Sequence, residues 1–119
     1  MSDHPRFKNL ADDAKTRVPE ITPKDAAEQQ AKGATLIDVR EDQEFAKQHA
    51  KGAIHLSKGV LEWKIEDTVP DVSTPIICYC GGGSRSALAA DNLMKMGYKN
   101  VSSLAAGFRG WQEAGLPTE

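Results

Sequence analysis

The chain has 119 residues, 27% of them charged, and a formal net charge of -2 at pH 7, a composition typical of one soluble globular domain. Its Lys and Arg residues are scattered, so neither nucleic acid nor an anionic membrane is an expected partner. No apolar stretch approaches the roughly 20 residues of a membrane-spanning helix, and the first twenty residues contain no apolar signal segment. We therefore expect a cytoplasmic location.

Residues 1–17 are polar and aperiodic, which predicts a flexible N-terminal arm ahead of one domain over residues 18–119. Within that domain, segments typical of strands alternate with segments typical of helices. Short apolar runs predict strands at residues 18–21, 35–39, 53–56, 75–79 and 100–104. Helices are predicted at residues 22–33, 41–49, 60–66, 84–96 and 108–114. This alternation indicates a three-layer α/β domain with a mainly parallel, about five-stranded central sheet flanked by helices.

The two cysteines, Cys78 and Cys80, are separated by one residue at the end of a predicted strand. This spacing gives poor geometry for a disulfide, and the three histidines show no metal-ligand spacing. We therefore expect reduced thiols, no metal and no cofactor. Cys78 is predicted to be a small core residue of its strand, with a resolving role as the alternative.

A glycine-rich loop follows the strand at residues 75–79 and leads into the helix that starts near residue 84. In parallel α/β sheets, ligands bind beyond the carboxyl ends of the strands, where such loops lie. Glycines allow the backbone to turn its N–H groups inward, and the helix N-terminus adds further N–H groups. This pattern predicts an anion cradle that favours a nucleophilic thiolate at Cys80, with a buried, inert cysteine as the alternative. The loop lacks the Lys of a Walker A loop and the spacing of a dinucleotide-binding loop.

Short motifs in a fixed order resemble the rhodanese (thiosulfate sulfurtransferase) family over residues 18–117. They are LIDVR at 36–40 followed by EF at 44–45, KGAIHL at 51–56, CGGGSRS at 80–86 and AGFRGW at 106–111. The resemblance implies a rhodanese-like fold and a double-displacement reaction. Cys80 would take sulfane sulfur from a small sulfur-containing anion, such as thiosulfate, or from a persulfide donor. It would then pass the sulfur to a thiol, to cyanide or to a protein acceptor.

The same resemblance assigns roles to the residues around Cys80, which would be the catalytic group. The substrate-binding residues would be Gly81, Gly82, Gly83, Ser84, Arg85 and Ser86. Asp38 and Arg40 have a supporting role that follows from their position instead, because they end a predicted strand near the same sheet edge as the loop. They would form a structural hydrogen-bond and ion-pair set (Arg40 with Glu44, for instance), with direct contact with substrate as the alternative. A monomer is the default expectation.

Two other functions stay open on these residues. The first is a non-enzymatic persulfide carrier or interaction module in a sulfur relay, which needs the same cysteine and loop. The second is a phosphatase or arsenate reductase, because related phosphatases use a Cys-x5-Arg loop on this fold. Only four residues separate Cys80 from Arg85, and Tyr79 stands where those phosphatases usually have His, so sulfur transfer is favoured.

Overall fold

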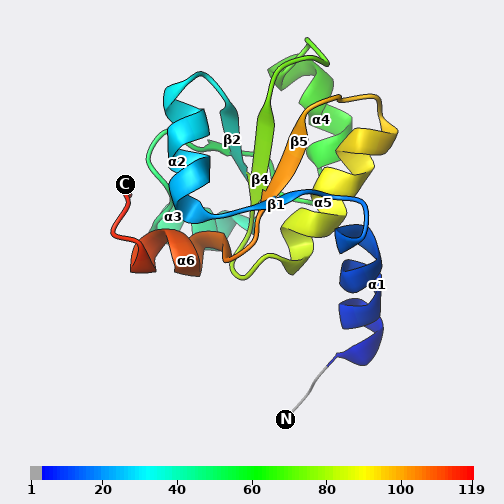
Figure 1. Cartoon of the computed structure of the whole chain (residues 1–119), viewed down its shortest axis with the longest axis horizontal. Helices are drawn as coiled ribbons and strands as arrows, with labels where there is room; N and C mark the ends of the chain where they lie inside the picture. Colours follow the sequence, from blue (N-terminus) through cyan, green and yellow to red (C-terminus); the bar gives the residue numbers. More distant parts are fainter. Residues whose placement is uncertain (1–3) are drawn as a thin grey trace.

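The computed structural model describes residues 4–119, and one five-stranded sheet forms its centre (Figure 1). The strands are β1 (Glu20–Ile21), β2 (Thr35–Asp38), β3 (Ile54–His55), β4 (Ile76–Tyr79) and β5 (Val101–Leu104). They pair in the order β1-β5-β4-β2-β3, and every pair is parallel. β4 is central and buried at all of its residues, as its continuous apolar sequence predicts. The predicted α/β fold with a parallel, five-stranded sheet is confirmed.

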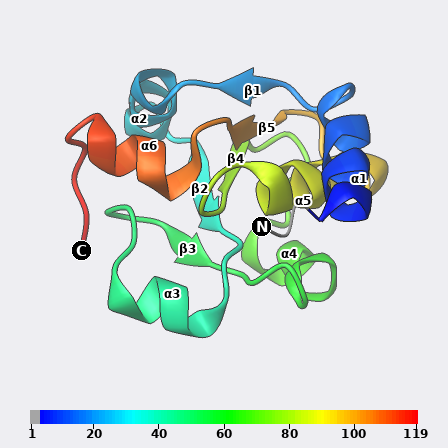
Figure 2. The ribbon, with the colours of Figure 1, turned by 90° about the horizontal axis from the view of Figure 1, so that it is seen from below.

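Helices cover both faces of the sheet, so the domain has three layers (Figure 2). They are α1 (Pro5–Lys15), α2 (Pro23–Ala31), α3 (Asp42–Lys47), α4 (Leu61–Thr68), α5 (Ser84–Lys95) and α6 (Gly107–Glu113). Figure 2 shows α2 and α6 on one side of the sheet and α4 and α5 on the other. Among the described residues, no helix combines the length and apolar character needed to cross a membrane.

Successive side chains along a strand point to opposite faces of the sheet, so alternate residues of β4 belong to two separate hydrophobic cores. Ile76, Cys78 and Cys80 belong to the core that includes residues of α4 and α5. Ile77 and Tyr79 belong to the core that includes residues of α2 and α6. Cys80, the residue that follows β4, therefore lies on the same face of the sheet as α5.

The N-terminal segment differs from its prediction. Residues Pro5–Lys15 form α1, which packs against α5 and buries Ala11 and Ala14. The description of the segment as aperiodic is wrong for these residues, because Phe7, Leu10, Ala11 and Ala14 follow the i, i+3, i+4, i+7 spacing of one helix face. Only the two alanines of this face are buried, and Phe7 and Leu10 are exposed. Arg17, just beyond the helix, donates to both carboxylate oxygens of Asp91 at 2.9 and 2.8 Å. The first three residues of the predicted arm lie outside the described residues, and the division of the chain at residue 17 stays a prediction.

Candidate active site

The loop that carries Cys80 lies at the carboxyl edge of the sheet. It leaves β4 at Tyr79 and enters α5 at Ser84, as its glycines and the neighbouring elements predict. The start of α6 lies against it, because the backbone N–H of Phe108 donates to the carbonyl of Cys80 at 2.7 Å. Figure 2 shows α5 and α6 approaching the same edge from opposite sides. The loop is thus held between two helix N-termini.

The sulfur of Cys80 points into this loop and is surrounded by donors. The backbone N–H groups of Gly83 and Ser86 donate to it, with N···S distances of 3.1 and 3.3 Å. The hydroxyl oxygen of Ser86 lies 3.4 Å from the same sulfur. Cys80 is 1% exposed, so these contacts form away from bulk water. N–H dipoles at a helix N-terminus stabilise negative charge, and the loop therefore suits a thiolate or a persulfide anion.

Ser103 extends this contact by one step, and sequence reasoning missed it. Its hydroxyl lies 2.7 Å from that of Ser86, and both side chains are buried. When the sulfur is negative, Ser103 can donate to Ser86 and Ser86 to the sulfur, so every hydroxyl proton has an acceptor. The sequence offered no signal for this role, because Ser103 is one of two adjacent serines in a four-residue strand.

Two glycines hold the loop in its closed shape. Gly83 has a φ of +107°, and a Cβ there would collide with the backbone carbonyl of Ala105. Gly107, at the start of α6, has a φ of +59°, and a Cβ there would overlap the carbonyl of Gly81. Both combine a left-handed conformation with close backbone contact, which only glycine allows without strain. At Gly82, by contrast, a Cβ would meet open space.

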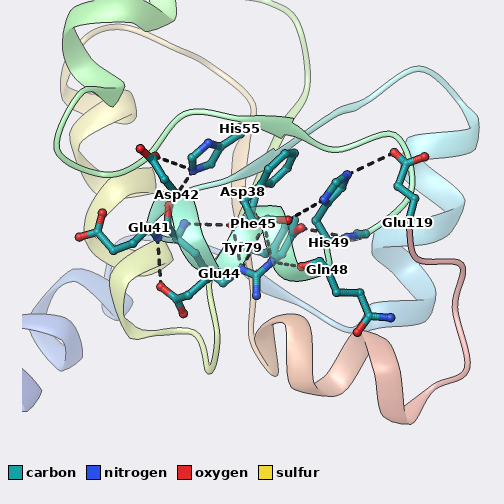
Figure 3. Close-up of polar contacts among 12 residues, drawn as sticks. Asp38, Glu41, Asp42, Glu44, Phe45, Gln48, His49, His55, Tyr79 and Glu119 are labelled. Atoms are coloured by element: carbon teal, nitrogen blue, oxygen red, sulfur yellow. Dashed lines mark hydrogen bonds and ion pairs between the residues drawn. The ribbon is translucent and has the colours of Figure 1, made fainter.

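Arg85, at the end of the loop, binds Glu44 of α3. Its Nη1 and Nη2 donate to Oε1 and Oε2 of Glu44 at 2.8 and 3.1 Å. The hydrogen bonds from Arg85 lower the pKa of Glu44 to about 2. Oε1 of Glu44 also accepts the backbone N–H of Glu41 at 3.0 Å, a contact visible in Figure 3. This ion pair fixes the end of the loop to the start of α3 across 41 positions of sequence.

Replacing Glu44 by Gln is expected to lower the free energy of unfolding at pH 7, because the ion pair is lost. The folded-state pKa of about 2 lies below the ordinary value of 4.5. The ion pair therefore stabilises the fold fully above pH 4.5, and its contribution falls as the pH drops from about 4.5 towards 2. Urea denaturation of both proteins at pH 7 and at pH 3 measures this difference. A gap of equal size at the two pH values would contradict the ion pair.

Asp38 and Arg40 form a buried ion pair beside the loop. Nε and Nη2 of Arg40 donate to the Asp38 carboxylate, the Nη2–Oδ2 distance being 2.8 Å, and Nη2 also donates to the carbonyl of Gln48 at 2.7 Å. The guanidinium carbon lies 4.4 Å from the ring centre of Phe108. Arg40 is thus paired with Asp38, and the expected pair with Glu44 is wrong because Glu44 is bound to Arg85.

The structure separates the predicted site residues into two groups. Only Gly83 and Ser86 contact the sulfur of Cys80. Within residues 4–119, the other predicted site residues form no hydrogen bond with the sulfur: Asp38, Arg40, Gly81, Gly82, Ser84 and Arg85. Cys78 is fully buried in the core, and burial raises the pKa of its thiol to about 12, which supports the predicted role of a small core residue. Within residues 4–119, no cluster of three or more His, Cys, Asp or Glu residues could hold a metal ion.

Comparison with known proteins gives a consistent result. The rhodanese-like domain family matches residues 22–114 of the chain. Thiosulfate sulfurtransferase GlpE of Haemophilus influenzae is 42% identical over 101 residues, which cover 84% of this chain and 93% of that protein. The structure of a Rhodopseudomonas palustris protein of unknown function, described as a possible tyrosine phosphatase, superposes with a TM-score of 0.86 at 29% identity over 95% of this chain and 93% of that one. A thiosulfate sulfurtransferase from Pseudomonas aeruginosa superposes with a TM-score of 0.78 at 33% identity, over 85% of this chain and 20% of the larger one.

These matches define the class of protein to which the fold and the cysteine loop point. The chain belongs to the rhodanese-like domain family. The family match and the GlpE relatives confirm the prediction that the protein is a rhodanese-type enzyme.

Proposed function

We propose that the protein is a sulfurtransferase that moves sulfane sulfur from a small anionic donor, such as thiosulfate, to an acceptor through a persulfide on Cys80. The observation that supports this proposal most strongly is the environment of the Cys80 sulfur. Two backbone N–H groups and one hydroxyl surround it, in a loop closed around a single sulfur atom. The GlpE relative, whose name states this activity, supports the choice of donor.

The reaction needs two displacements on sulfur. In the first, the Cys80 thiolate attacks the outer sulfur of thiosulfate, and the S–S bond of the donor breaks with its electron pair leaving on sulfite. In the second, an acceptor attacks the outer sulfur of the resulting persulfide, and the electron pair of that S–S bond returns to Cys80. The N–H groups of Gly83 and Ser86 stabilise the negative sulfur before and after each step.

Hydrolysis of phosphate esters is the less suitable reaction for this site. A phosphatase of this fold would need a loop one residue longer than the four residues that separate Cys80 from Arg85. Nη1 and Nη2 of Arg85 also each donate to Glu44, so the positive charge of the guanidinium is already paired with a carboxylate. A persulfide carrier without turnover uses the same contacts as the enzyme, and only kinetics separates the two functions.

Steady-state assays with thiosulfate and cyanide test the proposal. We expect repeated formation of thiocyanate, and no hydrolysis of an aryl phosphate above the rate in buffer. A single equivalent of thiocyanate per protein would indicate a carrier, and catalysed hydrolysis of the aryl phosphate would favour a phosphatase. The cytoplasmic location, the monomeric state and the nature of the natural donor stay predictions.

A further inference from the structure

A pocket of about 250 Å³ lies between α3 and α6, beside the loop that carries Cys80. Its lining residues are Arg40, Glu44, Lys47, Gln48, Phe108 and Gln112. Two of them also touch the loop: Glu44 binds Arg85, and the backbone N–H of Phe108 donates to the carbonyl of Cys80. The pocket and the loop therefore share a wall. Figure 3 shows Glu44 of α3 and Gln48, the residue that follows this helix, and α3 forms one side of the pocket.

Arg40 presents unused donors to this pocket. Its side chain is only 7% exposed, and Nε and Nη2 are occupied by Asp38 and by the Gln48 carbonyl. Nη1 has no hydrogen-bond partner among residues 4–119. Within this described part of the chain, every completely buried side-chain nitrogen or oxygen has a hydrogen-bond partner. Nη1 has none, so it is not completely buried and is accessible to solvent. Because Arg40 lines the pocket, a buried and rigidly held guanidinium offers two N–H groups there.

Lys47 gives the pocket an uncompensated positive charge. The other charged groups of the lining are balanced, since Asp38 pairs with Arg40 and Arg85 pairs with Glu44. Lys47 is exposed and forms no ion pair within residues 4–119. The electrostatic potential of the lining therefore favours an anion.

The size and the apolar wall of the pocket favour an organic anion. Its volume corresponds to about eight water molecules, more than a small inorganic anion fills. The ring of Phe108 forms one wall and is held in place by the Arg40 guanidinium. Gln48 and Gln112 close the rim through a hydrogen bond of 3.0 Å between their side-chain amides. A carboxylate next to a short carbon chain matches this combination of charge, ring and volume.

We propose that this pocket binds the carboxylate of a small organic thiol, and that this thiol accepts the sulfur carried by Cys80. The inference rests on the sulfurtransferase function proposed above. The thiolate of the bound acceptor attacks the outer sulfur of the Cys80 persulfide, and a new S–S bond forms. The bond between that sulfur and Cys80 breaks, its electron pair returns to Cys80, and the acceptor leaves as its own persulfide. The step needs neither an oxidant nor a reductant.

The test compares two acceptors, N-acetylcysteine and N-acetylcysteine amide, that differ only in the charged carboxylate. Cys80 is first loaded with thiosulfate, and loss of the persulfide to each acceptor is then followed in a single turnover by intact mass. Lys47→Glu is expected to slow transfer to N-acetylcysteine about fivefold at low acceptor concentration, and transfer to the amide less than twofold. Gln112→Glu places a negative charge on the α6 side of the pocket and is expected to have the same selective effect.

Lys99→Glu is the matched control, because it makes the same change in net charge at an exposed position. Lys99 lies between α5 and β5, at the edge of the sheet opposite Cys80, and its variant is expected to slow neither acceptor more than twofold. Equal slowing of both acceptors by Lys47→Glu, or equal effects of Lys47→Glu and Lys99→Glu, would overturn the pocket proposal alone. Failure of thiosulfate to load Cys80 in the first step would instead contradict the proposed function.

Discussion

Replacing Cys80 by Ser is expected to reduce thiosulfate:cyanide transfer by at least about a thousandfold, because the reaction loses its nucleophile. The fold should persist, since a serine hydroxyl can accept the same N–H groups of Gly83 and Ser86 that now donate to the sulfur. Thiocyanate formation measures the loss, and thermal unfolding monitored by circular dichroism checks the fold.

Cys78→Ala is the matched control for this variant. Cys78 is buried in the core two residues before Cys80, and its removal is expected to cost about 1 kcal/mol of stability while sulfur transfer continues. If Cys78→Ala abolished transfer while the protein stayed folded, Cys78 would be a second participant in the reaction, and the assignment to Cys80 alone would be wrong.

Gly83→Ala is expected to lower kcat/KM for thiosulfate by at least about a hundredfold. The left-handed conformation at φ +107° costs an alanine about 1–2 kcal/mol, and its Cβ would collide with the carbonyl of Ala105. The backbone of Gly83 must then move, and its N–H leaves the sulfur of Cys80. A displacement of about 1 Å in a reacting site is enough for a loss of this size.

Gly97→Ala is the matched control for this variant, because it introduces similar backbone strain at a position away from Cys80. Gly97 follows α5 with a φ of +102°, and a Cβ there would meet open space. This variant should therefore lose stability through the same left-handed conformation and keep its activity. Steady-state kinetics and urea denaturation of the two variants measure both effects. Equal activity in Gly83→Ala and Gly97→Ala would show that the N–H of Gly83 has no role in sulfur transfer.

The sequence carries the local features of the fold clearly. Thr22 followed by Pro23 predicts a helix start, and in the structure the Thr22 hydroxyl oxygen accepts the backbone N–H of Asp25 at 3.2 Å. The apolar run before Cys80 predicts a buried strand, and the glycines after it predict the turn into α5. These features depend on backbone preferences within a few residues, so a single sequence is sufficient to recognise them.

Contacts between distant segments could not be predicted in this way. Arg85 binds Glu44 of α3, and Ser103 of β5 hydrogen-bonds to Ser86. The sequence around these residues contains no feature that predicts either contact. Arg40 has carboxylates on both sides along the chain, among them Asp38 and Glu44, and only the three-dimensional arrangement selects its partner. The pocket that includes Lys47 likewise exists only because α3 and α6 meet beside the loop.

Intact-mass analysis of the protein after incubation with thiosulfate tests the central claim most directly. The wild-type protein is expected to gain one sulfur atom, the Cys80→Ser variant none, and the Cys78→Ala variant one. Peptide mapping should place the added sulfur on Cys80, and cyanide should remove it as thiocyanate. A wild-type protein that gains no sulfur from thiosulfate or any other sulfane donor, or that carries it on Cys78, would contradict a persulfide mechanism at Cys80.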